Sequence, residues 1–170
     1  MRKKVNAEKT LAISTHLVLP HETNTLGNLM GGQLLNWIDI NSAIAAHRLC
    51  RRVVVTASVN NVAFNKSIGL GQIVTIESKV SRSFNSSMEV FSEVFVEDHI
   101  TGERSKCNES IYTFVAVDQN GQTIEVPELV PVTEDEKTRF DGALRRKQLS
   151  LILAKRMKPE EASELKALFG

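Results

Sequence analysis

The sequence has little of what would indicate a nucleic-acid-binding, membrane or disulfide-rich protein. In 170 residues, 21 Lys and Arg stand against 20 Asp and Glu, so no strong basic field would attract a phosphate backbone. The two cysteines, Cys50 and Cys107, do not have the spacing of a disulfide framework or a zinc site. No apolar run approaches the roughly 20 residues of a membrane span, and the basic start has no apolar signal region behind it. We therefore expect a cytoplasmic protein with no nucleic-acid partner and no membrane insertion.

Hydropathy patterns predict one strand followed by one long helix. From Leu11 to Leu19 apolar residues recur mainly at alternate positions, which is typical of a half-buried strand, and Pro20 ends it. Between residues 29 and 49 the apolar residues leave almost no side of a helical wheel free. This predicts a helix that begins near Gly31 and is buried on most sides.

Four further strands are predicted between this helix and residue 117. The segments 53–64, 73–82, 88–97 and 103–117 are rich in β-branched and aromatic residues, and turn-forming residues separate them. One curved antiparallel sheet wrapped around the apolar helix would bury most of its circumference, so we expect an α+β protein with the hotdog arrangement. Long open edge strands favour pairing with a second copy, which predicts at least a homodimer with a continuous sheet.

The chain changes character near its C-terminal end. Thr133 and Glu136 have the spacing of a capping box, which predicts that a helix begins there. The basic residues between 145 and 158 give this helix a charged face, which is either solvated or covers an edge and assists assembly. The sequence therefore divides into a domain over residues 1–125, with its core at about 11–118, and a mainly helical extension over 126–170.

Asp39 is the most informative position because it places an ionisable side chain in the middle of an apolar helix. Such a group must find a partner, become protonated or face a cavity. On a helical wheel Gly32, Asp39, Ala43 and Ala46 share one narrow stripe, so small side chains leave room for another group beside the carboxylate. Two interpretations remain: a ligand lies there, or Asp39 bonds an amide or hydroxyl of a strand that packs closely on the helix.

Glycines open the backbone at the predicted helix start. Free N–H groups of Gly31 and Gly32 at a helix N-terminus could stabilise a developing oxyanion, and glycine permits close approach of the carbonyl group under attack. A side-chain amide from Asn24 or Asn28 could add a donor or orient water. Gly31 and Gly32 could also be no more than a tight entry into the helix.

Several segments together resemble one family. The run His21-Glu22-Thr23-Asn24, the spaced glycines from Gly27 to Gly32 and Trp37-Ile38-Asp39 are similar to the cytosolic acyl-CoA hydrolases of the hotdog thioesterase superfamily. The segments 54–60, 64–68, 87–90 and 101–104 agree in the same order, and the resemblance covers about residues 11 to 150. It implies hydrolysis of an acyl-CoA to CoA and a carboxylic acid by a dimer or a trimer of dimers, without a metal or other cofactor.

The resemblance also assigns roles to residues. An Asp on the central helix is the general base or nucleophile, and an Asn in the preceding loop places water or the thioester, with one residue from each subunit; by position these are Asp39 and Asn24. Polar residues on the strand after the helix and in a later turn position the pantetheine arm of CoA. In this sequence the candidates are Thr56, Ser58 and Asn60, which alternate onto one face, and Ser86 and Ser87 in the turn. The alternative is that these polar residues form the solvent face.

One departure from the family pattern concerns the phosphates of CoA. Similar proteins carry Gly-Arg before the Ser-Ser-Met segment, whereas this chain has Phe84 and Asn85. Lys66 or Arg82 could reach the phosphates instead, or both could be exposed on a rim. Charge-assisted hydrogen bonds of this kind contribute about 1.5–3 kcal/mol each when well formed.

Two rival functions share the same fold. A hotdog dehydratase or hydratase would need a histidine in the site, whereas the loop and helix here offer Asn24 and Asp39. A non-catalytic regulator would bind acyl-CoA or a nucleotide in the same cavity without turnover. His21 and His47 stand apart from any second ligand or nucleophile, so we expect no metal site.

Overall fold

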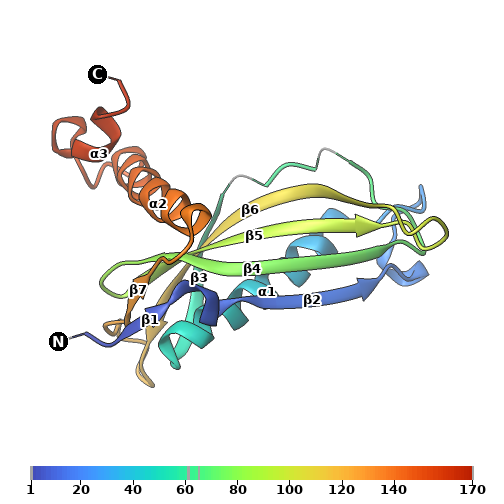
Figure 1. The fold of residues 1–170 in the computed structure, drawn as a ribbon, viewed down its shortest axis with the longest axis horizontal. Coiled ribbons are helices and arrows are strands. Elements are labelled where there is room, and N and C mark those ends of the chain that lie inside the picture. Colours follow the sequence, from blue (N-terminus) through green and yellow to red (C-terminus); the bar gives the residue numbers. More distant parts are fainter. Residues whose placement is uncertain (1, 61, 65, 170) are drawn as a thin grey trace.

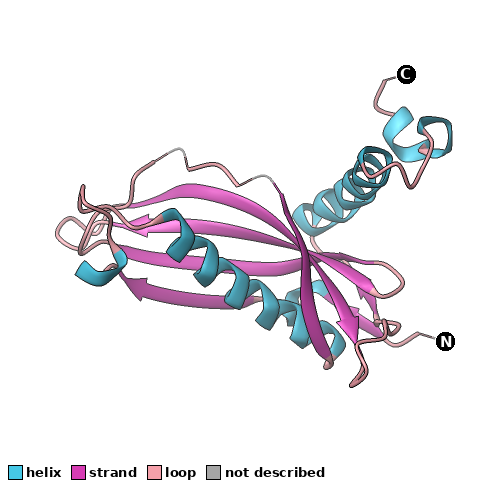
Figure 2. Cartoon of the chain, turned by 180° about the vertical axis from the view of Figure 1, so that it is seen from behind, coloured by secondary structure: helices cyan, strands magenta, loops and turns pink. Residues whose placement is uncertain are grey.

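The computed structural model describes residues 2–60, 62–64 and 66–169. Its main feature is a five-stranded antiparallel sheet of β2 (Ala12–Leu17), β4 (Ile73–Ser83), β5 (Ser87–Glu97), β6 (Arg104–Val117) and β3 (Val53–Asn60), in that order across the sheet. The sheet curls around α1 (Gly31–Cys50), which lies across one face (Figure 2). The α+β hotdog fold expected from the sequence is therefore confirmed.

The predicted strands correspond closely to the observed ones, but two of them end early. β2 ends at Leu17 rather than at Leu19. β3 ends at Asn60 rather than at residue 64, and described residues 62–64 form no strand. Residue 61 of the predicted strand and residue 65 of the following turn lie outside the described residues. The helix ends where Arg51 adopts a left-handed conformation with φ of 55°, and its N–H group donates to the carbonyl oxygen of His47.

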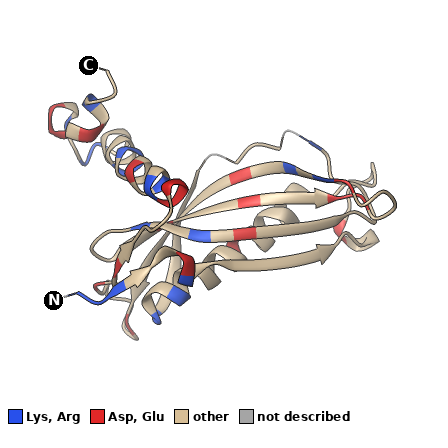
Figure 3. Ribbon diagram, in the orientation of Figure 1, with Lys and Arg blue, Asp and Glu red and all other residues tan. Residues whose placement is uncertain are grey.

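A second, small sheet and the C-terminal helices complete the chain. β1 (Lys4–Asn6) pairs in parallel with β7 (Glu128–Val130). The N–H group of Leu129 in β7 donates to Ser83 Oγ, so this small sheet lies beside the end of β4. The capping box predicted at Thr133 and Glu136 is confirmed, and α2 (Glu134–Leu153) begins directly after it. α2 starts at one end of the sheet, on the side opposite α1, and projects outward to the short α3 (Ser163–Lys166) (Figure 1). Charges of both signs are interleaved over the strands and α2 (Figure 3).

The core lies between α1 and the inner face of the sheet. Ile38, Ala45 and Leu49 of α1 are buried against Val74, Val90 and other apolar strand residues. The opposite side of α1 is open, since Ile40 and Ile44 are 53% and 41% exposed. In the single chain the predicted helix therefore keeps one exposed side, because one curled sheet covers only part of its circumference.

A buried polar cluster fixes the rotation of α1 on the sheet. The amide of Asn41 donates to Ser78 Oγ at 2.7 Å and to the carbonyl oxygens of Ala12 and Ile76. Ser42 Oγ lies 2.8 Å from Ser92 Oγ, which is 2.7 Å from Ser78 Oγ. Two residues turn a helix by about 200°, so holding Asn41 against β2 and β4 directs Asp39 away from these two strands.

Candidate active site at the free edge of the sheet

Asp39 and Thr56 meet where α1 passes the edge strand β3. The Thr56 hydroxyl donates a hydrogen bond of 2.7 Å to Oδ1 of Asp39. Asp39 is half-buried and Thr56 is exposed. The contact bears out the strand-hydroxyl interpretation of Asp39, yet it leaves Oδ2 without a hydrogen-bond partner among the described residues. The carboxylate is thus oriented by one contact and keeps an oxygen that can accept a proton.

Tyr112, which no sequence pattern singled out as a site residue, lies beneath this carboxylate. Its hydroxyl donates to the carbonyl oxygen of Leu35, one turn before Asp39 on α1, at 3.2 Å. Burial, together with the negative charge of Asp39, raises the pKa of Tyr112 to about 12. Tyr112 therefore remains a neutral donor at physiological pH. It is the sole tyrosine of the sequence and points inward from a predicted strand, which is the one signal that could have identified it.

A β-bulge separates the polar residues predicted to share one face of β3. Thr56 pairs with Phe114 and Ser58 pairs with Thr113, and the register shifts between them. Phe114 and Thr113 are consecutive, so their side chains point to opposite faces of the sheet. The prediction that Thr56, Ser58 and Asn60 share a face is therefore wrong: Thr56 faces α1, whereas Ser58 and Asn60 face α2.

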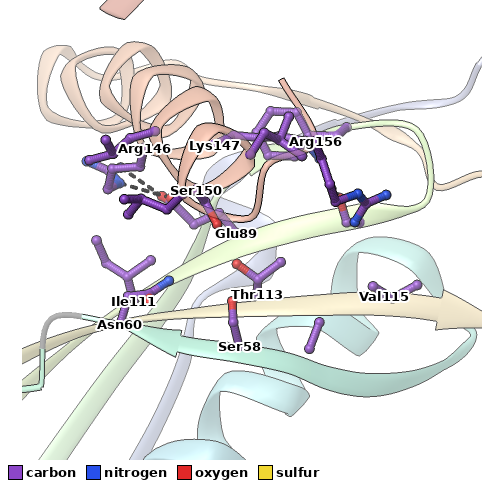
Figure 4. A pocket seen from close by; sticks show the side chains of 16 residues that line it. Ser58, Asn60, Glu89, Ile111, Thr113, Val115, Arg146, Lys147, Ser150 and Arg156 are labelled. Atoms are coloured by element: carbon purple, nitrogen blue, oxygen red, sulfur yellow. Dashed lines mark hydrogen bonds and ion pairs between the residues drawn. The ribbon is translucent and has the colours of Figure 1, made fainter. Parts of the chain in front are cut away.

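Ser58, Asn60 and Ser87 line a groove of about 530 Å³ between the outer face of the sheet and α2 (Figure 4). We call it the α2 groove; it also contains side chains of Arg146, Lys147 and Arg156. Ser86 belongs to the neighbouring turn, where its carbonyl oxygen accepts a hydrogen bond from the N–H group of Ala116. The predicted substrate-positioning residues thus divide between the Asp39 site on one face of β3 and the α2 groove on the other.

The start of α1 presents free backbone donors. Among the described residues, the N–H groups of Gly31 and Gly32 have no hydrogen-bond partner, and the N-cap residue Met30 supplies no side-chain cap. The ring of Phe64 covers Gly31 so closely that a Cβ atom there would lie 3.2 Å from it, whereas the space beside Gly32 is open. These donors fit the predicted oxyanion site.

The predicted oxyanion donors and the predicted general base lie far apart within one chain. Gly31 precedes Asp39 by eight residues, which corresponds to about 12 Å along the helix axis. One thioester carbonyl cannot contact both. Within one chain the N–H groups of Gly31 and Gly32 and the carboxylate of Asp39 therefore cannot act on the same thioester group.

Asn24 is held in a hydrogen-bonded loop before α1. Its side-chain oxygen accepts hydrogen bonds from the N–H groups of Leu26 at 2.9 Å and Asn28 at 3.2 Å, and its own N–H donates to the carbonyl oxygen of Asn28. Gly27, with φ of 74°, makes the turn possible. The amide nitrogen of Asn24 has no acceptor among the described residues, so the loop orients a free donor.

The two cations predicted to reach CoA phosphates have different environments. Arg82 donates to the carbonyl oxygen of Phe140 at 3.1 Å and lies 4.1 Å from the centroid of the Phe140 ring, so it secures α2 to the sheet. Burial lowers its pKa, and the neighbouring Asp141 opposes this shift. Lys66 is exposed on the loop after β3. Arg82 is therefore already engaged, and only Lys66 of the two is unpaired among the described residues.

The described part of the chain contains neither a metal-ligand cluster nor a helix that could span a membrane. Across residues 2–60, 62–64 and 66–169, no three His, Cys, Asp or Glu side chains gather as metal ligands would. None of the described helices has the length and apolar character of a membrane span.

Comparison with known proteins agrees with the fold. The family model of the thioesterase superfamily matches residues 26–103. The Bacillus subtilis protein named as uncharacterized acyl-CoA thioester hydrolase YkhA is 42% identical over 139 residues, which is 82% of this chain and 81% of the relative. The crystal structure of an apo-hexameric acyl-CoA thioesterase superposes with a TM-score of 0.86 at 38% identity, covering 89% of this chain and 97% of that one.

An acyl-CoA hydrolase from Staphylococcus aureus adds information on ligands and variants. Its complex with butyryl coenzyme A, coenzyme A and coenzyme A disulfide superposes with a TM-score of 0.81 at 30% identity, covering 96% of this chain and 99% of that one. Structures of that hydrolase also exist for three alanine variants, in which an asparagine, an aspartate and a threonine are replaced.

Proposed function

The chain belongs to the thioesterase superfamily, and we propose on this premise that it is an acyl-CoA thioesterase, which hydrolyses an acyl-CoA to CoA and a carboxylic acid. The observation that carries the proposal is the contact between Asp39 and Thr56 at the open edge of β3. It places a carboxylate with one free oxygen beside a surface that a substrate can reach.

The spacing of three residues supports this assignment. In the Staphylococcus aureus hydrolase, the replaced asparagine and aspartate are fifteen positions apart, and the aspartate and threonine are seventeen positions apart. Asn24, Asp39 and Thr56 have the same spacing in this chain. These three side chains lie in the loop before α1, on α1 and on the edge strand β3, respectively.

In the proposed reaction, Asp39 acts as the general base. Its free oxygen takes a proton from a water molecule while the water oxygen bonds to the thioester carbon, and the carbonyl oxygen becomes an oxyanion. The N–H groups of Gly31 and Gly32 and the amide of Asn24 donate to that oxyanion. The carbon–sulfur bond then breaks, and the CoA thiolate takes up the proton. Direct attack by the Asp39 carboxylate through an anhydride is the second route.

Two copies of the chain are needed to assemble one site. Because Gly31 and Asp39 are about 12 Å apart along α1, a second copy packed antiparallel would bring its helix start to this Asp39. The surface that would form this contact is apolar: Val53, Val55 and Val59 are exposed on the edge strand, and Ile40 and Ile44 on the open side of α1. We therefore propose a dimer through β3 that joins further into a trimer of dimers.

Release of free thiol from a panel of acyl-CoAs tests the proposal directly. We expect the wild-type protein to hydrolyse at least one chain length, and we expect Asp39→Asn to reduce kcat at least about 100-fold. Asp141→Asn, which changes an exposed carboxylate on α2, is the matched control and should retain full activity. Binding of acyl-CoA without thiol release would instead identify a non-catalytic binding protein.

A further inference from the structure

The α2 groove carries an excess of positive charge that the Asp39 chemistry does not use. Its lining includes one carboxylate, Glu89, and three cations, Arg146, Lys147 and Arg156. Arg146 engages Glu89 through two hydrogen bonds of 2.9 and 2.7 Å, and Ser81 also donates to that carboxylate. Glu89 is therefore neutralised, and the groove retains the charges of Lys147 and Arg156.

Lys147 is held at the end of the groove next to the turn between β4 and β5. Its ammonium group donates to Ser87 Oγ at 3.0 Å and lies 3.9 Å from the centroid of the Phe84 ring. Burial is the main cause that lowers the pKa of Lys147, and the positive charge of Arg156 lowers it further. Among the described residues no carboxylate pairs with Lys147 or Arg156. A bound anion would supply the missing negative charge for both cations.

The turn between β4 and β5 offers no cation of its own. Its residues between the two strands are Phe84, Asn85 and Ser86. The structure places Lys147, a residue of the C-terminal helix, directly over Phe84. The turn therefore has no cation of its own, but Lys147 of α2 places one beside it.

The α2 groove is connected to the Asp39 site around the edge of the sheet. Residues two apart share a face in a regular strand, but the bulge in β3 directs Ser58 into the groove and Thr56 toward Asp39. β3 is an edge strand of the sheet in this chain, so the two faces meet at its outer side, and in the proposed dimer a ligand would pass there along the boundary between the two copies. A ligand with a flexible arm could extend from one face to the other.

We propose that the α2 groove binds the phosphate-bearing end of the acyl-CoA substrate, with Lys147 and Arg156 contacting its phosphates while the pantetheine arm crosses β3 to Asp39. This inference rests on the proposed function. The hydroxyls of Ser58, Thr113 and Ser150 line the groove (Figure 4), and the exposed side chains of Leu149 and Leu153 add an apolar wall. The C-terminal helix is then part of the substrate site, although the family model ends at residue 103.

Paired substrates separate phosphate binding from chemistry. We compare an acyl-CoA with the acyl-pantetheine that has the same thioester and no nucleotide, using the wild-type protein, Lys147→Gln, Arg156→Gln and the double variant. In the double variant we expect KM for acyl-CoA to rise about tenfold or more with kcat nearly unchanged, and both constants for acyl-pantetheine to stay at wild-type values. Lys137→Gln, which changes an exposed lysine at the other end of α2, is the control.

Direct binding makes the test independent of turnover. Titration calorimetry should show CoA binding the double variant about tenfold more weakly than the wild type, and higher salt should weaken wild-type binding more than variant binding. An unchanged KM and Kd in the double variant, or an equal loss of kcat with both substrates, would overturn the inference and leave the proposed function standing. Wild-type protein that binds CoA without hydrolysing acyl-CoA would contradict the proposed function alone.

A separate nucleotide site is the remaining alternative outcome. Adenosine 3′,5′-bisphosphate should inhibit competitively against acyl-CoA if the groove holds the substrate's own phosphates, and this inhibition should weaken in the double variant. Non-competitive inhibition that disappears in the double variant would identify a distinct regulatory site and overturn the assignment to substrate.

Discussion

Thr56 Oγ1 donates to Asp39 Oδ1 at 2.7 Å, so the edge strand β3 holds the carboxylate that projects from α1. This hydrogen bond connects β3 to α1, and the relative position of these two elements sets where the Asp39 carboxylate lies. The contact uses one carboxylate oxygen and leaves the other without a hydrogen-bond partner among the described residues. In the proposed reaction Thr56 would be a positioning group, because its effect would be exerted through Asp39.

Replacing this hydroxyl should impair the chemical step. We expect Thr56→Val, which keeps the branched shape, to lower kcat at least about tenfold because the carboxylate loses its orienting hydrogen bond. Thr56→Ser retains the donor and should restore most of the activity. Steady-state kinetics with one acyl-CoA check this, and full activity in Thr56→Val would show that Asp39 does not depend on this contact.

Asn24→Asp separates two functions of the loop residue. The aspartate keeps an oxygen that can accept from the N–H groups of Leu26 and Asn28, so the loop should fold as before. It removes the amide donor, and loss of one oxyanion donor typically reduces kcat by about 100-fold or more. Kinetics together with the melting temperature test this. A variant that remains stable and fully active would exclude Asn24 from the reaction.

Mixed oligomers test whether each site combines two chains. Asp39→Asn and Asn24→Asp chains, each inactive alone, should regain activity when they are co-expressed, because a mixed dimer contains one site with both residues intact. Random pairing predicts about a quarter of the wild-type sites. The measurement is thiol release by the purified mixture. No recovery in proven mixed dimers would mean that Asn24 and Asp39 serve the same site within one chain.

The anchorage of α2 should weaken in acid. Burial opposes ionisation of Glu136, but hydrogen bonds from the N–H groups of Val132 and Thr133 and from Lys79 outweigh it and lower its pKa below the ordinary 4.5. A lowered folded-state pKa contributes stability that is present above the unfolded value and is lost as the pH falls through the folded one.

Glu136→Gln is the variant that reports this effect. It should unfold about 1 kcal/mol more easily at neutral pH, and the difference from the wild type should shrink as the pH falls below 4.5. Denaturant unfolding at a series of pH values measures it. A constant difference between the two proteins down to pH 3 would show that the Glu136 charge does not stabilise the fold.

Hydropathy and turn chemistry were sufficient for most of the fold, because both act over a few residues. The apolar period of α1, most of the strand boundaries and the capping box of Thr133 and Glu136 agree with the structure. β1 and β7 were not predicted, since each has three residues and forms only by pairing with the other across the chain. Resemblance, not periodicity, indicated Asn24 as a partner of Asp39.

The faces of β3 could not be read from the sequence. Strict alternation places Thr56, Ser58 and Asn60 on one face of the strand. The bulge adds one residue between Thr56 and Ser58, so Ser58 and Asn60 point to the opposite face from Thr56. Whether a bulge forms depends on hydrogen bonds to β6, some 55 residues further along the chain, and no local pattern encodes it. The place of Arg82 was hidden for the same reason, because α2 folds back over it.

By itself the sequence determined that an apolar helix carrying one carboxylate would lie in a curled sheet, because side-chain hydropathy and the 3.6-residue period decide which faces leave water. Tertiary structure alone decided what surrounds that carboxylate: Thr56 beside it, Tyr112 beneath it, and a cationic groove behind the same strand. These neighbours come from segments far apart in the chain, and only the packing of helix on sheet brings their side chains within hydrogen-bonding or Coulombic distance.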